Sequence, residues 1–372
     1  PGIGSYLLQR LVFVWFALGL FALSVVGFKR LSEKRKYVGW IIPVCFWAGI
    51  VTACCYLFPF ERHNELRDHY RSIYERYDNT PKVNTNKHEI TFRQEGERLS
   101  STSKLMIENR NLTAIDTLLF YLNPGLELSG LTIDGREMSF EREEQVIIIP
   151  YGLQPGDSLS VTMSYSGKID PFICYPDIEN KEFNEMDFNN MLCLGHRFFF
   201  LTDAFTLLTP ETIWYPTTIP VTNIGFPWMS RRDYTLYRLT VVDPVQKTVL
   251  SQGEMSVKED TIRFDNKQNL FGITLVMGDM DKEQFRALDF LSEYYYPRGE
   301  IPCQGAFLAS EEGKTQSVER IKWLFTTYYK YPYGKVQLVE VPVSFHTFIR
   351  RWREGTDYVH PELFFVSERR TS

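Results

Sequence analysis

Apolar residues are concentrated at the start of the chain, where two long runs contain no charged residue. The first run is Leu11–Phe28, eighteen residues, and the second is Tyr37–Phe60, twenty-four residues. An α-helix rises about 1.5 Å per residue, so each run nearly reaches or exceeds the length that crosses a hydrocarbon core of roughly 30 Å. The pattern predicts two transmembrane helices, a membrane hairpin, within residues 1–60. A signal peptide is the alternative for the first run, but no small-residue cleavage site follows and a second run comes at once.

Helical spacing continues beyond the second run. Apolar and aromatic residues recur at intervals of three and four among charged ones: Leu66, Tyr70, Ile73, Tyr74 and Tyr77. This spacing predicts an amphipathic stalk helix over residues 61–78. The polar segment 79–86, which contains Pro81, is predicted as a linker. Stalk and linker together form the segment 61–86.

From about His88 to Met280 the chain changes to short runs of Val, Ile, Leu, Thr and Tyr. Turn residues separate these runs, for example Asn123-Pro124-Gly125 and Asp134-Gly135. The runs predict strands over residues 88–93, 104–109, 117–122, 128–133, 146–149, 158–166, 234–242, 248–252, 261–264 and 272–277. The stretch 168–230 is less regular and rich in aromatic residues. So many strands without an intervening helix predict an all-β saddle or sandwich domain over residues 87–292.

After Met280 helical spacing returns, most clearly at Val318, Ile321, Phe325 and Tyr328, which follow a predicted helix cap at Ser317. The segment Lys335–Val341 then alternates like a strand, and residues 363–366 are also strand-like. These elements predict the incomplete start of a thermolysin-like α/β domain over residues 293–372. Because the sequence starts at Pro1 rather than Met, we expect it to be one portion of a longer protein.

Charge gives the predicted hairpin an orientation. The loop between the two apolar runs carries five basic residues, Lys29, Arg30, Lys34, Arg35 and Lys36, against one acid, Glu33. The positive-inside rule therefore predicts that this loop is cytoplasmic and that residues after Arg62 are extracytoplasmic. The chain as a whole has a net charge of −5. This balance offers no excess of positive charge for a polyanion, so nucleic acid is not an expected partner.

The cysteines fall into two groups. Cys45, Cys54 and Cys55 lie in the second apolar run, where we expect them to act as small apolar side chains. Cys174 and Cys193 are nineteen positions apart in the irregular stretch and would face an oxidising compartment. A disulfide between them is a hypothesis that the spacing allows but does not require, and Cys303 is left over. No Cys-x-x-Cys pair occurs, which disfavours zinc binding by cysteines.

The order of several segments from residue 87 to residue 366 resembles a known family. They are SLSVTMSYSG at 158–167, IWYPT at 213–217, the strand pair within 234–253, LVMGD at 275–279 and YKYPYGKVQLVEVP at 329–342. This order is similar to that of the gluzincin aminopeptidases of the aminopeptidase N type. The resemblance implies a saddle-like β-domain followed by a thermolysin-like domain that binds catalytic zinc.

The hairpin with its basic loop extends the resemblance. Together with the β-domain it looks like bacterial proteins in which the permease part of an ABC transporter is fused to an extracytoplasmic aminopeptidase-like domain. That similarity implies the bacterial inner membrane as location, further transmembrane helices before Pro1, and peptide or protein cargo. No Gly-rich phosphate loop is present, so the ABC ATPase would be a separate subunit.

The zinc motif of this family is absent from the chain. Such peptidases need His-Glu-x-x-His on one helix, because imidazoles four residues apart converge on one metal while the Glu activates its water. Of six histidines only His88 precedes a Glu, and position 92 is Phe92. In the family the motif lies beyond the point reached at Ser372. We therefore assign no catalytic, cofactor or metal residue here, expect zinc only in a longer protein, and leave enzyme activity open.

A second family element should fall within the chain. The family follows its Val-Pro strand with a Gly-x-Met-Glu-Asn edge strand, whose Glu holds the α-amine of the substrate. Here Val341-Pro342 is followed by residues VSFHTFI, and Gly-x-Met-Glu-Asn occurs nowhere. Loss of such a charge-assisted contact costs about 1.5–3 kcal/mol. This departure argues against an exopeptidase role, even for a zinc-bound longer protein.

Other histidines favour structural roles. His63 and His69 are six residues apart, so they do not share one helix face. His196 lies beside aromatic residues and is predicted to pack in a loop, while His360-Pro361-Glu362 is predicted as a turn. Asn111-Leu112-Thr113 is a glycosylation sequon by pattern.

Three functional hypotheses follow. The first is the distal part of an ABC-type permease whose extracytoplasmic aminopeptidase-like domain binds or handles peptide or protein cargo. The second is a membrane-anchored zinc metallopeptidase, in which the hairpin only tethers the domain. The third is a structural subunit of an envelope complex that uses the β-domain as an interaction surface.

Overall fold

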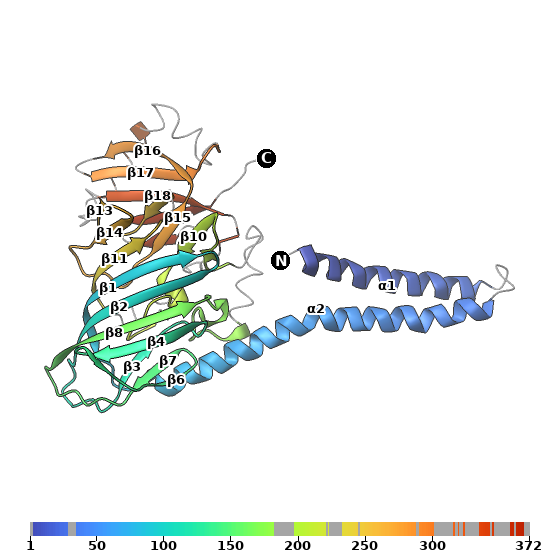
Figure 1. The fold of residues 1–372 in the computed structure, drawn as a ribbon. Helices are drawn as coiled ribbons and strands as arrows, with labels where there is room; N and C mark the ends of the chain where they lie inside the picture. Colours follow the sequence, from blue (N-terminus) through green and yellow to red (C-terminus); the bar gives the residue numbers. More distant parts are fainter. Residues whose placement is uncertain are drawn as a thin grey trace. The chain divides into compact units, whose positions relative to one another are not determined.

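The computed structural model divides the chain into two compact units, Pro1–His69 and Tyr70–Ser372 (Figure 1). The described residues are 3–28, 35–181, 197–220, 222, 233–244, 246–287, 290–300, 315, 316, 319, 323, 335–342, 344, 345, 358–360 and 362–367. Ser317, Val318, Ile321, Phe325 and Tyr328 lie outside this part, and so do the loop residues 29–34.

The first unit contains two apolar helices, as the uncharged runs predict. Helix α1 covers Ile3–Gly27 and α2 begins at Arg35. Glycines lie where the two helices meet: a Cβ on Gly19 would lie 3.0 Å from the ring of Phe46, and one on Gly49 would lie 3.1 Å from the ring of Phe16. Small residues at these positions let the helices pack closely. Only 11% of the most apolar window of each helix is buried, so most apolar side chains point outward.

Helix α2 is one element from Arg35 to Asp78 and includes Pro43 and Pro59. The predicted helix over residues 61–78 is therefore confirmed as the last part of α2, but the predicted change of element at residue 60 is not a break in the helix. A Pro inside a helix removes one backbone hydrogen bond without necessarily ending the helix, particularly in an apolar segment.

The last turns of α2 belong to the second unit and pack on its β-strands. The Tyr70 hydroxyl donates to Asp170 at 2.8 Å, and the Tyr77 hydroxyl donates to Glu143 at 2.7 Å. The Gln145 side-chain amide donates to the Tyr70 carbonyl at 2.7 Å. The linker predicted after this helix is shorter than 79–86, because strand β1 begins at Asn84 and pairs with β2 from there.

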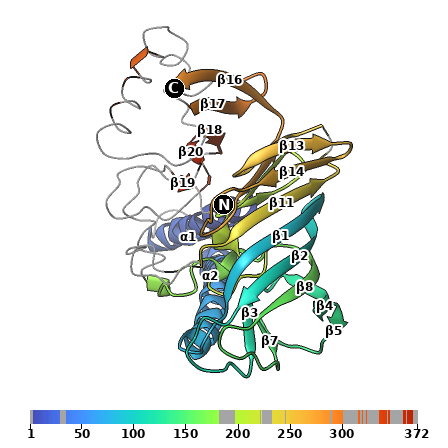
Figure 2. The ribbon, with the colours of Figure 1, turned by 90° about the vertical axis from the view of Figure 1, so that its left-hand side faces the viewer.

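An eight-stranded sheet forms most of the β-domain (Figure 2), in the order β13-β14-β11-β1-β2-β8-β4-β5. Its strands are β1 (Asn84–Glu95), β2 (Arg98–Glu108), β4 (Leu126–Ile133), β5 (Arg136–Glu137), β8 (Ser158–Gly167), β11 (Leu236–Val242), β13 (Glu254–Lys258) and β14 (Thr261–Asp265). Neighbours are antiparallel except β1 and β11, which are parallel. The predicted turn Asp134-Gly135 joins β4 to β5 with positive φ angles of 47° and 80°, as a tight hairpin requires.

Two smaller sheets complete this mostly β domain. One has the order β3-β7-β6 and the other β12-β15-β10-β9. Their strands are β3 (Leu118–Tyr121), β6 (Glu141–Glu143), β7 (Val146–Ile149), β9 (Phe200–Leu201), β10 (Phe205–Leu208), β12 (Thr248–Leu250) and β15 (Leu275–Gly278). Strands β9 and β10 lie in the stretch predicted to be irregular. Their residues are almost all apolar, so they show no alternation that would mark a strand.

A five-stranded sheet follows, in the order β16-β17-β18-β20-β19. Its strands are β16 (Met280–Ala287), β17 (Phe290–Pro297), β18 (Lys335–Val341), β19 (Tyr358–His360) and β20 (Leu363–Ser367). The two strand-like segments at its end are confirmed as β18 and β20. The four residues that show helical spacing most clearly, within 318–328, lie outside the described part of the chain, so that prediction stays a prediction. The β16–β17 hairpin occupies 280–297 and spans the predicted boundary between 292 and 293.

Candidate functional site

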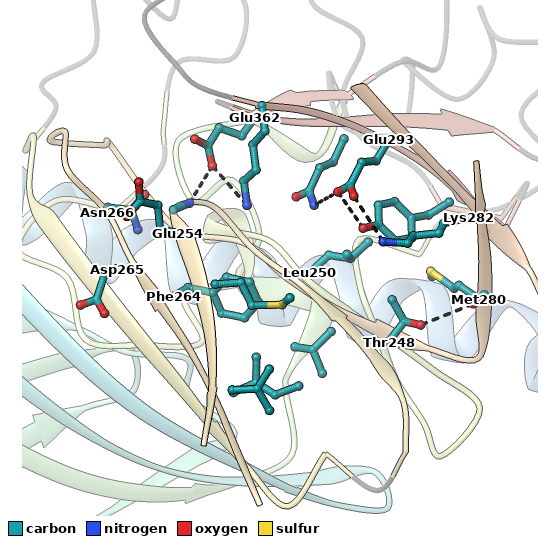
Figure 3. A pocket seen from close by; sticks show the side chains of 18 of the residues that line it. Thr248, Leu250, Glu254, Phe264, Asp265, Asn266, Met280, Lys282, Glu293 and Glu362 are labelled. Atoms are coloured by element: carbon teal, nitrogen blue, oxygen red, sulfur yellow. Dashed lines mark hydrogen bonds and ion pairs between the residues drawn. The ribbon is translucent and has the colours of Figure 1, made fainter. Parts of the chain in front are cut away.

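A cleft of about 890 Å³ lies between β12–β14 and the five-stranded sheet (Figure 3). Its size falls in the usual range of ligand sites, roughly 300–1,000 Å³. One wall comes from β12, β13 and β14, and the other from β16, β17, β18 and Glu362. Both walls belong to the second unit.

The wall on the five-stranded sheet is polar because residues at alternate positions face the same way. Lys282 on β16, Glu293 and Tyr295 on β17, and Lys335 and Gln337 on β18 all line the cleft. The register places Glu293 opposite both Gln284 of β16 and Gln337 of β18. Such cross-strand neighbours are close enough for their side chains to interact.

Glu293 is a buried carboxylate held by several donors. The Gln284 amide donates at 2.7 Å, the Tyr295 hydroxyl at 2.8 Å and the Gln337 amide at 3.0 Å, while the Lys282 ammonium lies at 3.5 Å. Burial alone would raise the pKa of Glu293, but these donors outweigh it and lower the pKa. Glu293 is therefore an ionised group in the wall at neutral pH.

A second charged pair, Lys335 and Glu362, lines the cleft near Glu293. The carboxylate of Glu362 accepts a hydrogen bond from the Gly253 amide at 2.6 Å and lies 3.6 Å from the Lys335 ammonium. That ammonium also donates to the Ser251 carbonyl at 3.0 Å. Burial lowers the pKa of Lys335, although Glu362 and Glu293 act in the opposite direction. These contacts join β18 and the turn before β20 to the corner between β12 and β13.

The opposite wall carries an apolar patch among charged residues such as Glu254 and Lys267. Phe264 and Ile262 on β14 lie opposite Met255 and Val257 on β13, and all four line the cleft. Phe264 is buried, whereas Met255 and Val257 are exposed. The Lys335 ammonium lies 5.8 Å from the centre of the Phe264 ring, within cation–π range. This apolar patch, which we call the floor of the cleft, lies opposite the polar wall, an arrangement that suits an amphipathic ligand.

The sequence did not predict this cleft, although the pattern of one of its strands contained a relevant signal. The alternation in 335–341 places Lys335 and Gln337 on one face of a predicted strand, and a charged residue on an inward face marks a site worth testing. The residues of β13 and β16 gave no such signal, because both strands are largely polar and were not predicted.

The four histidines in the described part of the chain lie on three different elements. His88 is confirmed in a strand, where it is buried; its ring bonds the Ser103 hydroxyl at 2.9 Å, and burial lowers its pKa to about 3. His63 and His69 lie on α2, and His360 ends β19. His196 and His346 lie outside the described residues. Within the described part of the chain no three His, Cys, Asp or Glu residues are placed to hold a metal, so these residues do not fit a zinc ion.

The predicted disulfide stays a prediction. Cys174 is buried, and Cys193 lies outside the described residues.

Among the described residues, β19, Tyr358–His360, is one edge of the five-stranded sheet and pairs antiparallel with β20. Of the residues after Val341-Pro342 the structure describes Ser344 and Phe345, and Phe345 forms an isolated bridge with Arg197. The predicted turn before Leu363 is confirmed, since His360 pairs with Leu363 and Glu362 has a φ of 66°. The edge sequence is Tyr-Val-His, so the strand carries no carboxylate.

Comparisons with known proteins identify the fold. No protein-family model matches the chain, and no curated protein matches it. An M1 zinc metallopeptidase from Deinococcus radiodurans superimposes with a TM-score of 0.53 at 13% identity, covering 77% of this chain and 60% of that one. Aminopeptidase A from Legionella pneumophila, solved with aspartic acid, superimposes with a TM-score of 0.55 at 11% identity, covering 77% of this chain and 31% of that one. The chain thus spans less than two thirds of either structure, and what it shares with them is the fold of M1 peptidase domains.

Proposed function

We propose that this chain is part of a bacterial inner-membrane transporter of the ABC type, in which an extracytoplasmic domain of M1 fold binds peptide or protein cargo. The observation that carries the proposal is the 890 Å³ cleft, which combines an apolar floor with a buried ionised carboxylate inside a fold also found in peptide-cleaving enzymes. Peptides present this combination of apolar side chains and polar backbone.

The two apolar helices support the membrane part of the proposal. Their large side chains, such as Phe13, Phe21, Trp40 and Trp47, are 63–76% exposed. A helix in the core of a soluble protein would bury such residues, because each contributes about 1.5–3 kcal/mol when removed from water. Lipid or further transmembrane helices would cover them here, and an ABC ATPase subunit would bind on the cytoplasmic side.

Peptide binding is tested directly on the full chain in lipid nanodiscs. A fluorescent pool of random dodecapeptides, blocked at both ends, should bind saturably and be displaced by the same pool without dye. Blocked ends remove the terminal amine that an aminopeptidase requires, so any binding does not depend on recognition of that amine. Absence of saturable binding would overturn the proposed function.

The M1 fold favours one further candidate, a membrane-anchored zinc metallopeptidase. For the chain as given we expect substoichiometric zinc by elemental analysis and no hydrolysis of aminoacyl anilides, because no His-Glu-x-x-His is present. Stoichiometric zinc together with turnover that a chelator abolishes would favour the peptidase instead. A purely structural envelope subunit would show neither peptide binding nor turnover.

A further inference from the structure

Strand β13 is an unusual edge. It is the outer strand of the eight-stranded sheet within the part of the chain that the structure describes, and all five of its residues are exposed. Met255 is 58% exposed and Val257 is 64% exposed. Natural proteins usually protect edges with charges, prolines or bulges; β13 has charges only at its ends, Glu254 and Lys258, and the apolar pair between them can accept another strand.

The two exposed residues face the cleft. Met255 lies opposite Phe264 and Val257 lies opposite Ile262, so the four side chains form an apolar ladder on one face of β13 and β14. All four line the cleft. A strand added to the free side of β13 would continue this ladder, and its alternate side chains would point into the same space.

The opposite wall holds a polar atom that lacks a partner. The side-chain oxygen of Gln337 is buried, and no described residue donates a hydrogen bond to it. Its orientation is fixed because the amide nitrogen of the same side chain donates to Glu293 at 3.0 Å. A buried acceptor without a donor carries a desolvation cost within this wall.

Charge limits the nature of the ligand. Four lysines and four acids line the cleft: Lys247, Lys267, Lys282, Lys335, Glu254, Asp265, Glu293 and Glu362. Several of them already form ion pairs, as Lys267 does with Glu254 and Lys282 with Glu293. A neutral ligand therefore fits better than an ion. A second copy of the chain paired edge to edge would cover β13 but leave the 890 Å³ behind it unfilled.

We propose that β13 and the cleft behind it bind an extended, uncharged peptide segment with alternating apolar side chains, which pairs with β13 as an added strand and packs against Met255 and Val257. The inference rests on the proposed peptide-binding function and states where and how the peptide binds. Backbone pairing supplies affinity in this mode, and the ladder supplies selectivity for apolar residues at alternate positions.

The test measures fluorescence anisotropy with the full chain in lipid nanodiscs. The probe is a blocked peptide in which Val and Leu alternate with Thr. Met255→Lys should weaken its affinity at least tenfold by placing a charge in the ladder. The matched control is Ser256→Lys, also exposed, at the neighbouring position of β13 and on the other face, and it should stay within twofold of the wild type. Both side chains are at the surface, so neither variant should affect folding, which circular dichroism checks.

Two control peptides test the pairing itself. Backbone N–H groups of alternate residues point to opposite edges of a strand. One peptide carries N-methyl groups on the residues whose N–H groups would face β13, and the other carries them on the remaining residues. Binding should disappear for one of them and persist for the other. Equal binding of both peptides, or an unchanged affinity of Met255→Lys, would overturn this mode of binding while leaving the peptide-binding function intact if the random pool still binds. A concentration-dependent dimer that Met255→Lys dissociates would also overturn it, because a second copy would then occupy the edge.

Discussion

At the residue scale, Trp214 shows how a motif noticed in the sequence can serve the fold. Its side chain is fully buried and contacts Phe92 at 5.7 Å and Tyr215 at 4.9 Å between ring centres. The Tyr215 hydroxyl accepts a hydrogen bond from the Ile273 amide at 3.0 Å. These residues connect the segment 213–217 with the core of the β-domain, which is the structural role that large aromatic residues beside Pro predict.

Trp214→Ala should lower the free energy of unfolding by about 3–5 kcal/mol, because it leaves a cavity that the surrounding strands fill only in part. Thermal or denaturant unfolding, followed by the circular dichroism of the β-domain, measures the change. Tyr234→Ala is the control, since Tyr234 is also aromatic but 56% exposed and should change stability by less than about 0.5 kcal/mol. Equal effects of the two substitutions would show that Trp214 does not anchor the core.

His88 makes the stability of the β-domain dependent on pH. Its pKa is about 3 in the folded state and 6.5 as the ordinary value, because burial opposes the charged form. Below pH 6.5 the unfolded chain therefore binds a proton that the folded chain does not, so stability is complete above pH 6.5 and falls as the pH decreases toward 3. The loss approaches roughly 1.4 kcal/mol for each pH unit within that window.

His88→Phe should remove this dependence between pH 6.5 and pH 5, where most carboxylates are still ionised. Phe suits the site, since Tyr215 and Tyr237 contact the imidazole at 5.4 and 5.6 Å between ring centres. Ser103→Ala is the matched control: it deletes the same hydrogen bond but keeps the imidazole, so its slope of melting temperature against pH should match that of the wild type. An unchanged slope in His88→Phe would assign the dependence to another group.

At the scale of elements, alternation and turn residues were enough to predict most of the main β-domain. Val146–Ile149 is apolar throughout and bounded by turns, and Ser158–Gly167 alternates along its whole length with the burial pattern of a one-sided strand. Asp134-Gly135 and Pro155-Gly156-Asp157 set the ends of their neighbours. These signals are local, so a single sequence carries them.

The missed elements depend on tertiary contacts. Strand β13, with the sequence EMSVK, is exposed at every position, and half of the residues of β16, with the sequence MDKEQFRA, are charged. Both form because a neighbour pairs with them, β14 in one case and β17 in the other. The cleft depends on this pairing, since Glu293 meets Gln337 across 44 positions of sequence. Spacing along the chain cannot place such a contact.

The contact of Lys335 with Glu362 should stabilise the attachment of the five-stranded sheet to the corner between β12 and β13. Lys335→Met leaves a mostly buried carboxylate without its cation, which costs about 3–5 kcal/mol in comparable buried pairs. The Gly253 amide still donates to Glu362, so we expect a loss near the lower limit. Glu362→Gln combined with Lys335→Met should be less destabilising than the sum of the single changes, as a double-mutant cycle in urea would measure. Additive effects would show that the two groups do not interact.

At the scale of the whole molecule, the two units of the chain differ in the surface that they expose. The first unit exposes apolar side chains that water solvates poorly, and the second buries an extensive apolar core. Mean hydropathy averages the two, at −0.23, and so describes neither unit. The similarity of fold covers 77% of the chain, and the membrane part rests on the length, composition and exposure of α1 and α2.

The orientation in the membrane is the last prediction. Five basic residues against one acid in the loop 29–36 predict a cytoplasmic loop, because short loops rich in Lys and Arg are retained on that side, so the second unit should be extracytoplasmic. In a background without native cysteines, Glu137→Cys should react with a membrane-impermeant maleimide added to intact spheroplasts. Ser32→Cys should react only after the membrane is opened. Glu137 is exposed on β5, so a lack of reaction there cannot be attributed to burial. Labelling of Ser32→Cys from outside, with protection of Glu137→Cys, would reverse the topology and place the cleft in the cytoplasm, where transport cargo from outside would not reach it.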